Sequence, residues 1–320
     1  HMGITEGGLD FRCQDCHKSR NHMITGRSIS VPAVEGDLSG EYCHTDRPHI
    51  GSELIDHHLN KHTRHVACQT CHIPIYAKGN PTKVFWDWST AGKDCTIPKD
   101  KYGKPEYAKK KGSFEWKEAA KPAYRWYNGT VKRHILGDRI NEEGITNLTE
   151  PIGHIKDPAS RIYPFKVHRG KQISDASFKY LIAPQLWKGY WDHWDWDKAA
   201  RDGMKYADLP YSGKYEFVET AMYWGLTHEV VPKEQALSCA ECHSSLNEAP
   251  YCGKCHQERL DVNFEELVFK GINFRRLAEM GRDVADLIGK TNYIDYKALG
   301  YAGDPIETGG RRDKLGLKVA

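Results

Sequence analysis

The 320-residue chain lacks any apolar run long enough to cross a bilayer, which requires about 20 consecutive apolar residues. The sequence therefore predicts no transmembrane segment. It also lacks a visible signal peptide, which would be a short apolar stretch behind a basic amino-terminal end.

Apolar side chains are scarce as well. They make up 39% of the residues and the mean hydropathy is −0.69, whereas Gly (29) and Pro (15) are plentiful. Such a chain has little apolar surface with which to build a core from side chains alone. It also lacks a long low-complexity linker, so we expect one intertwined unit rather than separable domains.

The cysteines are the most informative residues. Eight of the ten occur in four copies of Cys-x-x-Cys-His, the attachment signature of c-type haem. The two thiols form thioethers with the porphyrin, and the histidine is the proximal ligand of the iron. Zinc sites have no fixed histidine directly after the second cysteine, so four copies predict a multihaem c-type cytochrome. The copies are Cys13/Cys16/His17, Cys68/Cys71/His72, Cys239/Cys242/His243 and Cys252/Cys255/His256.

An incomplete fifth copy lies in GEYCHTDRPH, residues 40–49, where Gly40 stands in place of the first cysteine. Like CQDCHKSRNH, this stretch has Cys-His, four residues and another His. We predict a fifth haem c that is held by Cys43 and ligated by His44. Two alternatives stay open. Cys43 could form a disulfide with Cys95, which an exported protein permits, or Cys95 could supply the second thioether.

The 17 histidines indicate what kind of haem sites these are. An electron-transfer haem takes a second protein ligand, whereas a catalytic haem keeps that position open. His22 and His49 are the best candidates for distal ligands because they repeat at the same place after a motif. A helix is expected at residues 52–65, with Ser52 as its N-cap and three histidines on one face. These three histidines of the expected helix are further candidates, and so are five others elsewhere in the chain. The eight are His58, His62, His65, His228, His168, His134, His154 and His193.

The charge of the chain gives no reason to expect nucleic acid as a partner. The formal net charge is +3, and the propionates of four or five haems would change it to about −5 or −7. Covalent haem attachment takes place outside the cytoplasm, so we expect a mature, exported chain in the periplasm, outside the cell or at its surface. The first two residues, His1 and Met2, have two interpretations. They either belong to this mature chain or are a remnant of cloning.

Cysteine content divides the chain into three regions. Residues 1–100 hold two full motifs and Cys43-His44, residues 101–235 are free of cysteine and rich in aromatics, and residues 236–320 hold the last two motifs. Apolar residues recur at helical spacing between 277 and 288 and predict a helix there. The fold expected is mainly irregular coil with scattered α-helices wrapped around closely packed haems, and little β.

Several long phrases resemble the octahaem tetrathionate reductase family of cytochromes. They span most of the chain and include HVACQTCHIPIYAKGNPTKVFWDWSTAGK, RWYNG, YPFKVHRGKQ, YWGLTHEVVPKEQALSCAECH and LGYAGDP. Members of that family carry eight haems, and one haem has a lysine as proximal ligand in a CxxCK motif at the active site. This chain has no CxxCK and too few motifs. The resemblance implies that His44 is a proximal ligand and that the distal ligands are His22, His49, His62 and His228.

Three classes of function follow. The first is an electron-transfer protein with bis-histidine haems, whose partners are redox proteins and copies of itself assembled end to end into a filament. The second is a reductase of small sulfur or nitrogen oxyanions at an open haem. The third is a haem-based sensor or storage protein. The missing CxxCK and the surplus of histidines favour the first, with no catalytic residue.

Overall fold

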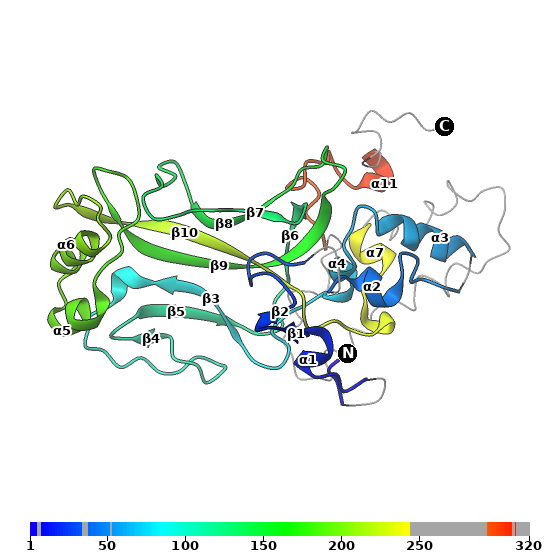
Figure 1. Ribbon diagram of the computed structural model, residues 1–320, viewed down its shortest axis with the longest axis horizontal. Helices are drawn as coiled ribbons and strands as arrows, with labels where there is room; N and C mark the ends of the chain where they lie inside the picture. The colour runs from blue at the N-terminus through cyan, green and yellow to red at the C-terminus, as the bar shows by residue number, and fades with distance from the viewer. Residues whose placement is uncertain (5–7, 34–37, 52, 244–292, 309–310, 312–320) are drawn as a thin grey trace.

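A computed structural model describes residues 1–4, 8–33, 38–51, 53–243, 293–308 and 311 of the chain. Three features predicted from the sequence lie outside these residues, namely the N-cap at Ser52, the fourth motif at Cys252, Cys255 and His256, and the helix expected at 277–288. Most of the short helices gather at one end of the molecule, and a long sheet leads from them to the other end (Figure 1).

The largest element is a mixed sheet of eight strands. Seven of them run in the order β4-β5-β3-β9-β10-β8-β7, and β6 pairs with β9 beside this path. Strands β9 and β10 form a long antiparallel ladder, whereas β3 joins β9 and β8 joins β10 in parallel. The strands are β3 (Thr82–Asp87), β4 (Tyr107–Ala108), β5 (Gly112–Lys117), β6 (Ala123–Tyr127), β7 (Thr130–Arg133), β8 (Thr146–Ile152), β9 (Arg161–Asp175) and β10 (Tyr215–Gly225).

This sheet shows that the expected fold, mainly irregular coil with little β, is wrong. Aromatic and β-branched residues are frequent between residues 101 and 235, and such residues favour strands. In β9 residues 162–165 are all buried, and Tyr163 and Phe165 pack against Tyr127 of β6 with ring centroids 5.4 and 5.7 Å apart. The side chains of this region therefore build a core of their own, which the low overall apolar share does not reveal.

Single-turn helices carry the described cysteine motifs. They are α1 (Cys13–Cys16), α2 (Gly40–His44), α4 (Cys68–His72) and α7 (Cys239–Cys242). The helix expected at 52–65 is observed as α3 (Glu53–His62), which ends at His62 so that His65 lies beyond it.

The other elements are short. A β1–β2 hairpin (Ser19–Arg20 and Met23–Ile24) follows α1. Two helices, α5 (Trp191–His193) and α6 (Trp196–Tyr206), lie at the far end of the sheet (Figure 1). The remaining elements are η1 (Trp88–Thr90), η2 (Leu186–Tyr190), η3 (Lys233–Gln235) and α11 (Pro305–Thr308). Within the described residues, no helix has the length and apolar character that a membrane span requires.

An aromatic cluster joins the sheet to the motif helices. Tyr124 and Trp126 of β6 pack with tyrosines of residues 293–301, and Cys242 of α7 contacts this cluster. The indole nitrogen of Trp126 donates to the Leu299 carbonyl over 2.8 Å, and the Tyr293 hydroxyl donates to the Pro74 carbonyl just after α4. The carboxy-terminal part of the chain thus fixes α4 and α7 against β6.

Candidate functional site

Each described Cys-x-x-Cys-His motif forms one helical turn. Residues three apart lie on the same face of a helix, so both thiols of a motif point the same way, as attachment to one porphyrin requires. In α4 the histidine closes the helix, and in α1 and α7 it directly follows the last helical residue. Of Cys239 in α7 only the backbone is described.

The incomplete motif has the same local structure. Residues Gly40–His44 form α2, a helix of the same length as α4, although Gly40 replaces the first cysteine. Glu41 accepts a hydrogen bond from Arg161 of β9 over 2.7 Å, which fixes α2 to the start of that strand. A Cβ placed on Gly40 would lie 3.5 Å from the sulfur of Cys68, so α2 and α4 are neighbours.

The structure separates Cys43 from Cys95. Both are free and exposed. Next to Cys95, Asp94 forms an ion pair with Lys109 over 2.6 Å, and the Lys109 ammonium lies over the ring of Trp194 beside α5. Helix α5 is at the far end of the sheet from α2 (Figure 1). In this structure neither a Cys43–Cys95 disulfide nor a thioether from Cys95 to a haem at Cys43 fits.

Three of the predicted proximal histidines have their Nδ1 atom beside an oxygen. The Nδ1 of His17 lies 2.9 Å from the Thr25 carbonyl, that of His72 lies 3.4 Å from the Val231 carbonyl, and that of His243 lies 2.7 Å from the Asp304 carboxylate. Carbonyl and carboxylate oxygens only accept hydrogen bonds, so the proton is on Nδ1. The other nitrogen, Nε2, then keeps its lone pair for a metal, which is the usual state of a ligating histidine.

Two of the candidate distal ligands also have an oxygen beside Nδ1, which leaves Nε2 for a metal. The Nδ1 of His49 lies 3.1 Å from the side-chain oxygen of Asn60, and the Nδ1 of His62 lies 2.8 Å from the His58 carbonyl. No motif in the sequence marks Asn60 or Asp304 as a partner of these histidines. Asn60 lies two positions before His62 in α3, and Asp304 belongs to the closing LGYAGDP phrase, but only the fold brings them to His49 and His243.

Two pairs of imidazole rings lie close to each other and are tilted with respect to one another. The ring centroids of His17 and His228 are 6.1 Å apart, and those of His62 and His243 are 6.2 Å apart. An imidazole nitrogen lies about 2 Å from a transition metal that it ligates, so two rings on opposite sides of one iron have centroids roughly 6 Å apart. The residues present therefore fit haem iron.

His72 lies close to two more of the predicted ligands. Burial lowers the pKa of the His72 imidazole, the Val231 carbonyl opposes this shift, and the nearby imidazoles of His49 and His44 lower the pKa further. A lowered pKa keeps the imidazole neutral, which is the form that binds metal.

Three other histidines have a hydrogen-bond donor beside Nδ1, which places their proton on Nε2, the nitrogen that would otherwise bind a metal. The Nδ1 atoms of His154 and His193 accept backbone N–H groups of Lys156 and Asp195, each over 3.1 Å, so their proton is on Nε2. His65 likewise has its Nδ1 3.3 Å from the guanidinium of Arg311. His134 differs from these three, because its Nε2 is buried without a hydrogen-bond partner in the protein.

Two predicted ligands lie apart from the two imidazole pairs. His168 is in the middle of β9 opposite Met222 of β10, and burial together with the Lys166 ammonium lowers the pKa of its imidazole. His22 is exposed in the turn of the β1–β2 hairpin, with a left-handed φ of 62°. Among the described residues, no proximal histidine faces either of them.

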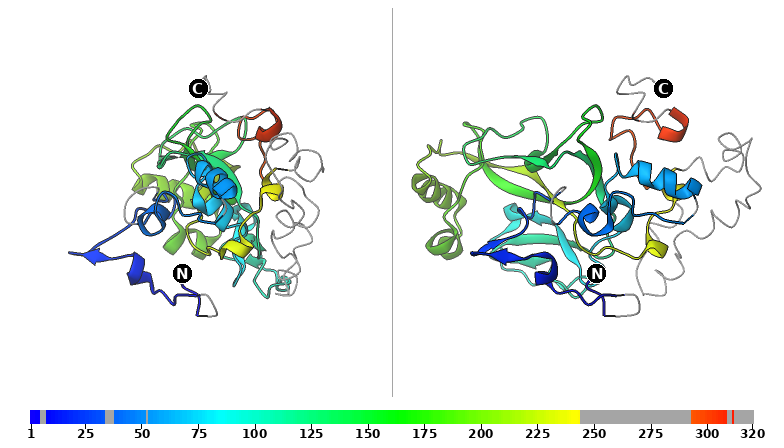
Figure 2. Two further views of the ribbon diagram at one scale, coloured as in Figure 1. Left: turned by 90° about the vertical axis from the view of Figure 1, so that its right-hand side faces the viewer. Right: turned by 45° about the vertical axis from the view of Figure 1, so that its right-hand side comes forward.

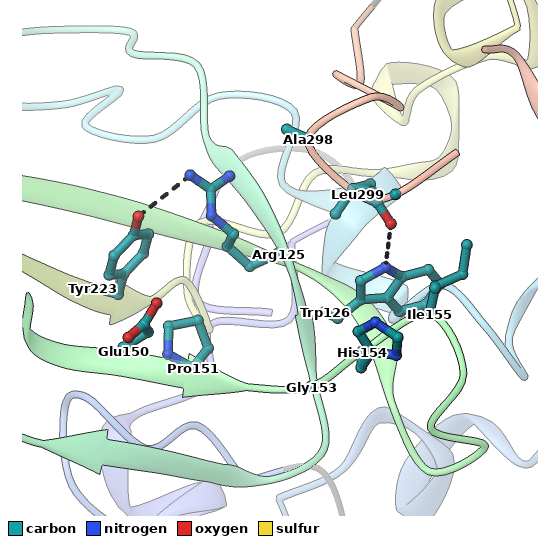
Figure 3. A pocket seen from close by; sticks show the side chains of 11 residues that line it. Arg125, Trp126, Glu150, Pro151, Gly153, His154, Ile155, Tyr223, Ala298 and Leu299 are labelled. Atoms are coloured by element: carbon teal, nitrogen blue, oxygen red, sulfur yellow. Dashed lines mark hydrogen bonds between the residues drawn. The ribbon is translucent and has the colours of Figure 1, made fainter. Parts of the chain in front are cut away.

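A small pocket lies beside the aromatic cluster, between β6, β8 and residues 298–300 (Figure 3). Its volume of about 270 Å³ is below the range usual for ligand pockets, roughly 300–1,000 Å³. Its polar groups are partly satisfied within the protein, since Arg125 donates to the Tyr223 hydroxyl over 3.3 Å. The histidine in its lining is His154, which is not prepared as a ligand, so this pocket is separate from the haem sites.

Comparison with known proteins agrees with this description. Residues 83–246 match the family described as bacterial cytochrome c. The crystal structure of octahaem cytochrome c from Shewanella oneidensis is similar to 94% of this chain, with a TM-score of 0.73 and 39% sequence identity. The chain covers 59% of that protein's length. The search of curated proteins found no match.

The resemblance to octahaem cytochromes and the prediction of haem c are thus confirmed. With four Cys-x-x-Cys-His motifs and a fold shared with an octahaem protein, the chain is a haem c-binding redox protein that belongs to the bacterial cytochrome c family, among its octahaem-type multihaem members.

Proposed function

We propose that this protein carries electrons along a row of closely spaced haems, each ligated by two histidines, and that it has no substrate-reducing site. The observation that carries the proposal is the two close imidazole pairs, His17 with His228 and His62 with His243, whose centroid distances suit two ligands of one iron. A bound haem c supplies the chemistry by gaining and losing one electron at its iron. Two strong protein ligands leave the iron no open position for a substrate.

The packing of the motif helices supports transfer from one site to the next. Helices α2 and α4 are neighbours at Gly40 and Cys68. The Leu237 amide, just before α7, donates to the Cys71 carbonyl over 3.0 Å. The Val231 amide, three residues after His228, donates to the His72 carbonyl over 2.8 Å. Backbone hydrogen bonds thus fix the positions of neighbouring attachment sites, which favours rapid electron exchange without movement of the chain.

The spin state of the ferric holoprotein tests this proposal. All haems are expected to be low-spin in the EPR and optical spectra, because two imidazoles produce a strong ligand field. A high-spin signal that accounts for one haem per chain would contradict the proposal. It would favour a reductase of small sulfur or nitrogen oxyanions at that haem.

We also propose that the protein is exported and that its copies assemble end to end. Export is supported by the covalent haem motifs, and assembly by the β1–β2 hairpin, which projects from the body of the molecule (Figure 2). Met23 and Ile24 on this hairpin are 73% and 68% exposed. Contact with a second copy would remove this apolar surface from water, which is favourable.

Assembly predicts a clear difference between two variants. Changing Met23 and Ile24 together to serine is expected to shorten or abolish the assemblies, as measured by light scattering and negative-stain microscopy. Ile50→Ser is the matched control, because Ile50 is 93% exposed but lies outside the hairpin. Small discrete particles of the unaltered protein at high concentration would contradict end-to-end assembly.

A change at Asp304 is expected to alter one reduction potential. The Asp304 carboxylate accepts the Nδ1 proton of His243 over 2.7 Å, and its side chain is only 5% exposed. A buried negative charge at this position strengthens the ligand and favours ferric iron. Asp304→Asn keeps an acceptor but removes the charge, so the potential of that haem is expected to rise by roughly 60 mV, a tenfold change for one electron.

Spectroelectrochemical titration measures this shift. Only one of the midpoint potentials is expected to move. Asp197→Asn removes the same charge from α6 at the far end of the sheet, where Asp197 pairs with Arg201, and is expected to leave all potentials unchanged. A falling potential in Asp304→Asn would contradict the assigned role of the carboxylate.

A further inference from the structure

A third pair of imidazoles is formed by a histidine that none of the sequence patterns identifies. The Nε2 of His1 lies 3.5 Å from the Nε2 of His44, and the two ring centroids are 5.7 Å apart with a tilt of 37° between the rings. This centroid distance is within half an ångström of those of the His17–His228 and His62–His243 pairs. His44 follows Cys43 in α2, so the pair lies at the incomplete motif.

Several contacts hold His1 in this position. The Phe11 amide donates to the His1 carbonyl over 3.0 Å, and the Asp10 amide donates to the Gly3 carbonyl over the same distance. The ring of Phe11 stacks on the imidazole of His1, with centroids 6.2 Å apart and an angle of 14° between the planes. The first residues are thus fixed against the segment that enters α1, and the imidazole of His1 is directed to α2.

We propose that His1 and His44 are the two axial ligands of a haem that is attached through Cys43 alone. This inference rests on the proposed function, because it assumes a haem at the incomplete motif. Two bonds of about 2 Å to one iron require roughly 4 Å between the ligating nitrogens. The observed distance of 3.5 Å needs only a small outward movement of two exposed side chains.

The surroundings of His44 favour His1 over the other candidate distal ligands. His49 is held by Asn60 through three hydrogen bonds and lies near His62 and His72. His22 is in the β1–β2 hairpin and does not face His44. In the described part of the chain, His1 is therefore the histidine best placed to complete the ligation of an iron bound by His44.

The inference predicts different effects on covalent attachment and on spin state. His1→Ala is expected to keep all haems covalently bound, since Cys43 still forms its thioether, but one haem equivalent per chain should become high-spin. Added imidazole is expected to restore the low-spin spectrum. Ile4→Ala is the matched control, because Ile4 is exposed in the same segment and its side chain has no atom that can bind iron. It is expected to change nothing.

A double variant separates this inference from the proposed function. In a Cys43→Ser background the haem at α2 is lost, so adding His1→Ala is expected to produce no further high-spin signal. If the unaltered protein carries only four haems, the haem at Cys43 does not exist and the inference is overturned, whereas electron transfer through the other haems stands. The unaltered protein could instead carry five low-spin haems while His1→Ala also remains fully low-spin. The fifth haem would then exist, but His1 would only form a hydrogen bond with His44. This result would overturn the inference.

Discussion

Replacing His228 with alanine is expected to convert one haem, the one attached through Cys13 and Cys16, from low spin to high spin. The ring centroids of His228 and His17 are 6.1 Å apart. The Nδ1 of His17 donates to the Thr25 carbonyl, so its Nε2 is left for iron. Loss of His228 leaves an iron with one strong ligand and an open position. EPR should show a high-spin signal equal to one haem per chain, and the reduced protein should bind one equivalent of carbon monoxide.

The matched control for this change is His154→Ala. His154 is exposed like His228, but its Nδ1 accepts the Lys156 amide, so it is not prepared as a ligand. This variant is expected to stay entirely low-spin and to bind no carbon monoxide. An unchanged spectrum in His228→Ala would remove His228 from the ligands and leave the close pair as a simple ring contact.

Replacing Cys43 with serine is expected to remove one covalently bound haem from the chain. Residues Gly40–His44 already have the helical turn of a complete motif, and a single thioether is sufficient to tether a porphyrin. Intact mass under denaturing conditions should show five haems in the unaltered protein and four in Cys43→Ser.

Cys95→Ser is the control that separates the remaining interpretations. Cys95 lies at the far end of the sheet from α2, so this variant is expected to keep five haems. A protein with four haems and a Cys43–Cys95 disulfide would contradict both the prediction and the observed separation of the two cysteines. A loss of covalent haem in Cys95→Ser would show that attachment requires Cys95, which contradicts a tether through Cys43 alone.

The haem motifs could be predicted from the sequence because their chemistry is local. Two thiols three residues apart and a following histidine are sufficient to specify attachment, and each described motif forms the required turn wherever it lies in the chain. Distal ligands are harder to predict, since they come from other parts of the chain. His62 and His228 are among the candidates and among the distal ligands that the family resemblance implies, and the fold brings them to His243 and His17.

The fold was mispredicted because its main signal is spread over a long region. Overall composition indicated little core, but the aromatic residues are concentrated in strands such as β6 and β9, where they pack on one another. The ladder of β9 and β10 joins residues 161–175 to residues 215–225. Pairing over such a separation depends on which faces are buried together, and an apolar count does not show this.

Binding of haem c at several sites can be predicted from the amino-acid sequence, because covalent attachment depends on residues that are neighbours along the chain. The fold is needed to show which imidazoles lie close together, which nitrogen of each is left for iron, and that Cys95 is remote from Cys43. These properties depend on contacts between distant segments, such as His243 with Asp304 and His44 with His1. Tertiary packing brings these residues together, and motif spacing alone does not predict such contacts.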